Sequence, residues 1–156
     1  MKILYICTHN RCRSILSEAI SNQRAEGLLD ARSAGSQPAG EVHPLSLRYL
    51  AQRGYSTEGL QSQSWDAFED FAPDLVVTVC DSAAGEACPL YFGKSVKVHW
   101  GLSDPSKIEG SEAELEQAFM TCIDEIERRV DQLIELAKDR PSPESLRAAL
   151  TALGAS

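Results

Sequence analysis

The 156-residue sequence lacks any long hydrophobic run. No stretch approaches the roughly 20 apolar residues that a membrane-spanning helix needs, so no membrane partner is expected. The N-terminus, Met1-Lys2-Ile3, opens straight into a short apolar segment. It has neither the long apolar region nor the small-residue cleavage site of a signal peptide. These features predict a cytoplasmic protein.

Positive charge is also scarce. The chain has 15 Lys and Arg against 23 Asp and Glu, a net charge of −8. A chain of this charge repels a nucleic-acid backbone, so nucleic acid is not an expected partner. The same charge repels small anions at long range. Arg11 and Arg13, which lie close together near the N-terminus, are therefore a local exception of the kind that an anion site requires.

Paired cysteine spacings of the CxxC type are absent, although the chain has five cysteines. In a reducing cytoplasm, cysteines are expected to be catalytic, metal-binding or simply buried rather than paired in structural disulfides. A zinc site built from Cys80, Cys88 and a histidine has no paired spacing to support it. Cys122 lies on the apolar face of a long predicted helix and is interpreted as a packing residue.

Strands alternate with helices along the chain, and no internal repeat is present. The clearest buried strand is 74–80, and the longest amphipathic helix is 111–138. The other predicted elements are strands at 2–7, 31–34 and 96–100 and helical segments at 14–27, 44–53, 65–71 and 144–153. This order predicts an α/β fold, a flavodoxin-like three-layer sandwich with a four-stranded parallel sheet whose first strand lies between the second and third. One domain is predicted over 1–138, with a C-terminal extension carrying a short helix over 139–156.

A loop near the N-terminus leads from a predicted strand into a predicted helix. Its sequence is Cys7-Thr8-His9-Asn10-Arg11-Cys12-Arg13-Ser14. Such a loop points successive backbone N–H groups into one concavity, where a tetrahedral oxyanion can bind. Arg13 can grip two oxygens of the anion, and the same groups should lower the pKa of the Cys7 thiol below its free value of roughly 8.5. The pattern predicts phosphoryl-type chemistry; the alternative is a buried Cys7 beside a solvated Arg13.

Two further reactive residues fall at or just past the ends of predicted strands, Cys80 and Asp104, and Cys88 lies in the loop that follows Cys80. Neighbouring strands lie about 4.8 Å apart, so Cys7 and Cys80 can approach disulfide distance with a modest loop movement. One interpretation is a thiol relay, in which Cys80 attacks an adduct on Cys7 and Cys88 resolves the resulting disulfide. The other is an ordinary buried strand residue and a chance loop cysteine. Asp104, before a proline, suits a general acid, although a turn aspartate has the same pattern.

Several motifs together resemble the thioredoxin-coupled arsenate reductases, which share the phosphotyrosine phosphatase I-like fold of the low-molecular-weight protein tyrosine phosphatases. The motifs are, in chain order, 7–14 (Cys-Thr-x-Asn-x-Cys-Arg-Ser), 33–35 (Ser-Ala-Gly), 74–80, Cys88-Pro89 and 99–105 (His-Trp-Gly-Leu-Ser-Asp-Pro). The similarity covers about residues 1–138. The compact members of this family lack the remaining tail.

The resemblance implies a role for each matching residue. Cys7 would be the nucleophile on arsenic, and Asp104 would protonate the departing hydroxide. Cys80 would then attack Cys7 and release arsenite, and Cys88 would form the Cys80–Cys88 disulfide that thioredoxin reduces. A glutaredoxin or a low-molecular-weight thiol is the alternative reductant. The oxyanion, arsenate with phosphate or sulfate as competitors, would be held by Thr8, His9, Asn10, Arg11, Cys12, Arg13 and Ser14.

The resemblance implies no tightly bound cofactor, but some members of the family bind potassium near the loop. The positions that match this potassium site are Asn10, Glu18, Ser33 and Asp66.

Two other functions are open at this level. A low-molecular-weight protein tyrosine phosphatase shares the loop and the Asp-Pro pair, but it usually carries aromatic residues after that proline, where this chain has Ser106-Lys107. Hydrolysis would also leave Cys80 and Cys88 without a use. The second alternative is a non-catalytic thiol sensor that binds arsenite or a soft metal through its cysteines.

Overall fold

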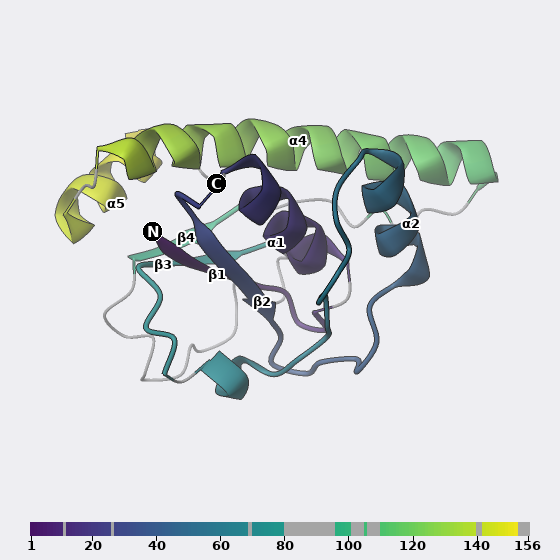
Figure 1. The fold of residues 1–156 in the computed structure, drawn as a ribbon, viewed down its shortest axis with the longest axis horizontal. Helices are drawn as coiled ribbons and strands as arrows, with labels where there is room; N and C mark the ends of the chain where they lie inside the picture. The colour runs from purple at the N-terminus through teal and green to yellow at the C-terminus, as the bar shows by residue number, and fades with distance from the viewer. Residues whose placement is uncertain are drawn as a thin grey trace.

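A computed structural model of the chain describes residues 1–10, 12–25, 27–68, 70–79, 96–100, 105, 110–139 and 142–152. Its sheet is parallel throughout and has the strand order β2-β1-β3-β4 (Figure 1). The strands are β1 (Lys2–Ile6), β2 (Asp30–Ala34), β3 (Leu75–Thr78) and β4 (Val96–His99). The helices are α1 (Arg13–Arg24), α2 (Pro44–Gln52), the 3-10 turn η1 (Trp65–Phe68), α4 (Glu112–Lys138) and α5 (Pro143–Ala152). The predicted α/β fold, with the first strand between the second and third, is confirmed.

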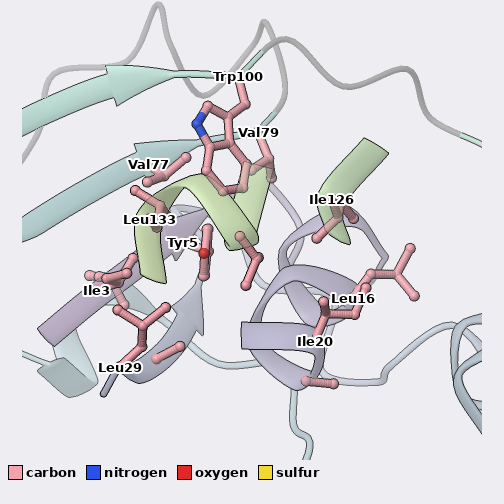
Figure 2. Close-up of a cluster of buried hydrophobic side chains, with 14 of the residues drawn as sticks. Ile3, Tyr5, Leu16, Ile20, Leu29, Val77, Val79, Trp100, Ile126 and Leu133 are labelled. Atoms are coloured by element: carbon pink, nitrogen blue, oxygen red, sulfur yellow. The ribbon is translucent and has the colours of Figure 1, made fainter. Parts of the chain in front are cut away.

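Both faces of the sheet are buried. The apolar cluster over one face joins side chains of the sheet to α1 and α4 (Figure 2), and its labelled members are Ile3, Tyr5, Leu16, Ile20, Leu29, Val77, Val79, Trp100, Ile126 and Leu133. Leu4 and Val76 alternate with these strand residues, so they point to the opposite face, and both are 0% exposed. Burial on both faces explains why the two central strands, β1 and β3, read as continuous apolar runs.

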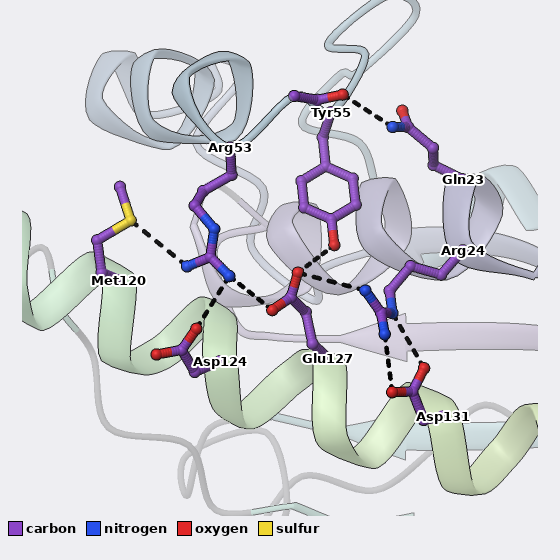
Figure 3. Close-up of polar contacts among 9 residues, drawn as sticks. Gln23, Arg24, Arg53, Tyr55, Met120, Asp124, Glu127 and Asp131 are labelled. Carbon is purple, nitrogen blue, oxygen red and sulfur yellow. Dashed lines mark hydrogen bonds and ion pairs between the residues drawn. The ribbon is translucent and has the colours of Figure 1, made fainter.

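Ion pairs and hydrogen bonds connect α4 to α1 and to the chain that follows α2 (Figure 3). Glu127 of α4 accepts hydrogen bonds from the Tyr55 hydroxyl and from Arg53, the latter at 2.7 Å. Arg24 of α1 pairs with Asp131 at 2.8 Å. The Glu127 side chain is only 18% exposed, so its ion pairs are less screened than surface pairs. Burial, and next the hydrogen bond to Glu127, raise the pKa of Tyr55.

The element boundaries differ from prediction by a few residues. Helix α1 ends at Arg24 rather than at 27, and Gly27 then adopts a φ of +94°, a conformation that a helix cannot continue. Helix α4 begins after Ser111, whose hydroxyl accepts the Glu114 N–H at 3.3 Å as an N-cap. In the tail, α5 lies beside β4, and its Leu146 is buried. Among the described residues, no helix combines the length and apolarity needed to span a membrane.

Two buried tyrosines give a matched stability test. The Tyr5 hydroxyl forms a 2.7 Å hydrogen bond with Ser21, whereas the Tyr49 hydroxyl has no hydrogen-bond partner in the described part of the chain. We expect Tyr5→Phe to lower the free energy of unfolding by about 1 kcal/mol. Tyr49→Phe should leave it unchanged or raise it by up to about 1 kcal/mol, because that hydroxyl is desolvated without compensation. Urea unfolding measures both, and equal losses would contradict the assignment.

Candidate active site

Cys7 lies at the carboxyl edge of the sheet, where ligands bind in open α/β folds. It directly follows β1, and its N–H donates to the Ala34 carbonyl of β2 at 3.2 Å. On the other side of β1, the Val79 N–H donates to the Ile6 carbonyl at 3.0 Å. Cys7 is 7% exposed and carries a thiol. The first residue of the predicted loop is thus held between the ends of two neighbouring strands.

Asn10 gives the loop its tight bend. Its φ is +46°, in the left-handed region that asparagine tolerates better than most residues. The side chain is fully buried: its amide donates to the Ser14 hydroxyl at 2.9 Å, and its carbonyl oxygen accepts the Gln63 N–H at 2.8 Å. Asn10 therefore connects the middle of the loop to the start of α1 and to a distant segment.

The peptide units of the loop have a defined direction. The Thr8 carbonyl accepts the Gln37 N–H and the His9 carbonyl accepts the Ala39 N–H, both at 2.9 Å. No peptide bond among the described residues is cis, and in a trans peptide the C=O and the N–H point in opposite directions. The N–H groups that share these two peptides, those of His9 and Asn10, consequently point away from the 37–39 segment. The 37–39 segment therefore fixes the direction of these two N–H groups by bonding to the carbonyls of the same peptides.

Gly35 allows the closest approach of β2 to the loop. A Cβ atom at this position would lie 2.5 Å from the Thr8 carbonyl oxygen and 2.7 Å from the Cys7 carbonyl oxygen. Both are backbone atoms, so no side-chain rotation can relieve the contact. The third residue of the Ser-Ala-Gly motif must therefore be glycine, because there is no room for a Cβ atom.

Helix α1 begins at Arg13, directly after the loop, and its first turn contains no acidic residue. The positive end of the helix dipole and the first N–H groups of the helix are therefore not neutralised by a local carboxylate. Cys12 and Ser14 are buried and Arg13 is half-buried. A strand end, a tight loop and a helix N-terminus together form the geometry that binds tetrahedral oxyanions in other proteins.

The carboxylate of Glu18 lies on α1, one helical turn beyond Ser14. The Ser33 hydroxyl of β2 donates to Glu18 of α1 at 2.6 Å. Burial raises the pKa of Glu18, and the hydrogen bond from Ser33 and the nearby Arg32 offset part of that effect. Asn10 uses its side chain for Ser14 and Gln63, and Asp66 is exposed. Among the described residues, no group of three or more His, Cys, Asp and Glu is placed to hold a metal ion.

The structure brings part of the predicted site together. Thr8, Asn10 and Cys12 follow Cys7 in one loop, Arg13 and Ser14 begin α1 directly after it, and His9 is exposed. The remaining predicted site residues, Arg11, Cys80, Cys88 and Asp104, lie outside the described residues, so the relay and the general acid stay predictions.

Sequence reasoning missed the residues that support the loop from outside, Gln37, Ala39 and Gln63. Gln37 and Ala39 act through their backbone N–H groups, as does Gln63 toward Asn10. A backbone donor leaves no signature in the side-chain sequence. Only the polar composition of 55–64 indicated that Gln63 lies in a loop.

The fold and the strand-to-helix loop define a phosphatase-like α/β protein with a cysteine at the start of that loop. The low molecular weight phosphotyrosine protein phosphatase family matches residues 2–142, and the chain belongs to this family.

Its relatives include proteins with a different named activity. The chain is 33% identical to an arsenate reductase of Halalkalibacterium halodurans over 87% of this chain and 96% of that protein. It is 32% identical to an arsenate reductase of Bacillus subtilis over 88% of this chain and 98% of that protein. Among solved structures, a thioredoxin-dependent arsenate reductase of Corynebacterium glutamicum matches with a TM-score of 0.69 and 28% identity, over 90% of this chain and 63% of the other.

Proposed function

We propose that this chain is an arsenate reductase that converts arsenate to arsenite with Cys7 as nucleophile and thioredoxin as reductant. The observation that carries the proposal is the similarity, over 87% of the chain, to a protein named arsenate reductase. The directed loop around Cys7 supports it, because arsenate is a tetrahedral oxyanion like phosphate. Phosphate and sulfate are accordingly expected to compete.

The first step forms a bond between sulfur and arsenic. Arg13 and the loop N–H groups bind the oxygens of arsenate and offset their negative charge. The Cys7 thiolate attacks arsenic, and a hydroxide leaves as water after taking a proton from Asp104. The product is an arsenate adduct on Cys7, in which arsenic is still in the +5 state.

The second step reduces arsenic. Cys80 attacks the Cys7 sulfur, the electron pair of the sulfur–arsenic bond stays with arsenic, and arsenite leaves as a disulfide forms between Cys7 and Cys80. Cys88 then attacks Cys80 and frees Cys7. The two thiols of thioredoxin reduce the Cys80–Cys88 disulfide. The contact between Val79 and Ile6 supports this order, because Cys80 and Cys7 are the residues that follow them in the sequence.

A coupled assay tests the proposal. Arsenate-dependent oxidation of NADPH is measured with thioredoxin and thioredoxin reductase, and in parallel with glutaredoxin and glutathione. We expect sustained turnover with thioredoxin. Sustained turnover with glutaredoxin alone would show that glutaredoxin, not thioredoxin, is the reductant. No arsenate reduction with either would refute the proposed arsenate reductase activity.

The alternative is hydrolysis of tyrosine phosphate, which the description of the matching family favours. The same loop would bind the phosphoryl group, and Cys7 would form a phosphocysteine that water then cleaves. Efficient hydrolysis of a phosphotyrosine peptide, without arsenate turnover, would establish this alternative. Slow hydrolysis of an aryl phosphate beside rapid arsenate turnover would support the reductase.

We further propose that Glu18 and Ser33, with Asn10 and Asp66, hold a potassium ion. Glu18 and Ser33 support the proposal, because they place two hard oxygen ligands in contact and the Glu18 carboxylate is partly buried without a hydrogen bond from a cationic side chain among the described residues. A bound potassium ion would supply positive charge behind the loop. Asn10 would bring this charge to the middle of the loop, which its bonds to Ser14 and Gln63 hold in place.

Glu18→Gln tests this site through stability. Because burial raises the pKa of Glu18 in the folded state, its contribution is favourable below the unfolded pKa near 4.5 and is lost as pH rises through the folded pKa. Without potassium, the variant should therefore be at least as stable as wild type at pH 7. Thermal unfolding in potassium chloride against choline chloride should show stabilisation of wild type alone. Equal stabilisation of both proteins would contradict the site.

A further inference from the structure

Ser62 joins three segments that are distant in the sequence. Its hydroxyl donates to the His9 carbonyl at 3.0 Å and accepts the Gly40 N–H at 3.2 Å. The next residue, Gln63, donates its N–H to Asn10 at 2.8 Å, and its own carbonyl accepts the Gly35 N–H at 2.9 Å. Ser62 therefore connects the Cys7 loop to the 36–40 segment from a chain position that is itself tied to β2.

The His9–Asn10 peptide is the part of the loop that most needs an external restraint. Turning this peptide over changes ψ of His9 and φ of Asn10, and Asn10 has the less common positive φ of +46°. A turned peptide would place the His9 carbonyl oxygen where the Asn10 N–H now points. The negative end of the peptide dipole would then replace a donor in the loop.

Two donors hold the His9 carbonyl in its present direction. The Ala39 N–H is a backbone group, whereas the Ser62 hydroxyl is a side-chain donor that also fixes the neighbouring Gly40. We propose that Ser62 is a positioning residue for oxyanion binding: it keeps the His9–Asn10 peptide oriented with its carbonyl outward. This role rests on the proposed oxyanion site and assigns no contact between Ser62 and the anion.

The test uses inorganic phosphate as the probe and the alkylation rate of Cys7 as the readout, followed by mass spectrometry of the Cys7 peptide. Protection of Cys7 by increasing phosphate gives the dissociation constant without any turnover. We expect Ser62→Ala to raise this constant roughly two- to tenfold, the range set by one net hydrogen bond. Ser62→Thr, which keeps the hydroxyl, should restore it to within about twofold, on the same hydrogen-bond argument.

Two controls separate positioning from a general loss of stability. Ser56→Ala removes another exposed hydroxyl, which accepts the Glu58 N–H at 3.3 Å, and should leave phosphate binding unchanged. If Ser62→Ala disturbs folding, the comparison is repeated with Ser62→Val and Ser62→Thr, whose side chains have the same shape and differ only in the hydroxyl.

Each outcome decides between the proposals. Wild-type affinity in both Ser62→Ala and Ser62→Val would overturn the role of Ser62 while leaving the oxyanion site intact. A lower melting temperature of these variants with unchanged phosphate affinity would also overturn the role of Ser62. Failure of phosphate to protect Cys7 in the wild type would instead refute the oxyanion site, and with it this role of Ser62.

Discussion

Cys80→Ser and Cys88→Ser are each expected to stop multiple-turnover arsenate reduction and to leave slow aryl phosphate hydrolysis largely intact. Reduction needs two electrons per arsenate, which the relay passes from thioredoxin to Cys7, whereas hydrolysis needs only the nucleophile, the oxyanion loop and the acid. Without Cys88, the enzyme should release at most about one arsenite per chain, because Cys7 stays trapped in a disulfide with Cys80. The thioredoxin-coupled assay and a single-turnover arsenite assay measure both quantities.

Cys122→Ala is the matched control, because Cys122 is a buried packing residue of α4. It should retain multiple-turnover activity apart from a modest loss of stability. Sustained arsenate turnover in both Cys80→Ser and Cys88→Ser would remove the relay from the mechanism. Loss of aryl phosphate hydrolysis in the same variants would show that the two cysteines support the loop rather than carry electrons.

Gly35→Ala is expected to lower kcat/KM for arsenate by about 10- to 100-fold, as displacement of a binding loop by a fraction of an ångström or more does in other enzymes. The added Cβ would lie 2.5 Å from the Thr8 carbonyl oxygen, so the backbone of the loop has to shift. The same overpacking should cost about 1–3 kcal/mol of stability. Steady-state kinetics and urea unfolding of the variant measure the two effects.

Ser36→Ala is the neighbouring control. The Ser36 hydroxyl is buried without a hydrogen-bond partner among the described residues, so its removal should preserve both activity and stability. If Gly35→Ala bound phosphate and turned over arsenate like the wild type, the close approach of β2 would not position the loop.

The fold was largely predictable because its signals are local. The apolar runs of β1 and β3 and the amphipathic pattern of α4 each lie in one contiguous stretch of the sequence. The strand order followed from the general preference of alternating strands and helices for a doubly wound sheet. The ends of the elements were less predictable, because a helix end depends on which cap the folded chain provides.

The loop motif was predictable for the same reason. A cysteine, an asparagine, an arginine and a serine within eight consecutive residues specify the chemistry that a strand-to-helix loop can offer. The resemblance to arsenate reductases used this motif together with those at 33–35, 74–80, 88–89 and 99–105, and the match of residues 2–142 to the phosphatase family agrees with it.

The support of the loop was not predictable. Gln63 donates its N–H to Asn10 across 53 positions of the sequence, and the Ser62 hydroxyl donates to the His9 carbonyl across 53. Such contacts depend on how the chain between the two partners folds, and backbone donors carry no side-chain signal.

The sequence by itself determined the class of fold, and it predicts the nucleophile and the residues that bind the oxyanion, because these follow from local periodicity and from a contiguous motif. Only the tertiary structure decided how the loop is held: which carbonyls face outward, why residue 35 must be glycine, and which distant serine donates to the His9 carbonyl. The physical reason is that hydrogen bonds between distant backbone groups form only once packing of the sheet and helices brings those groups together.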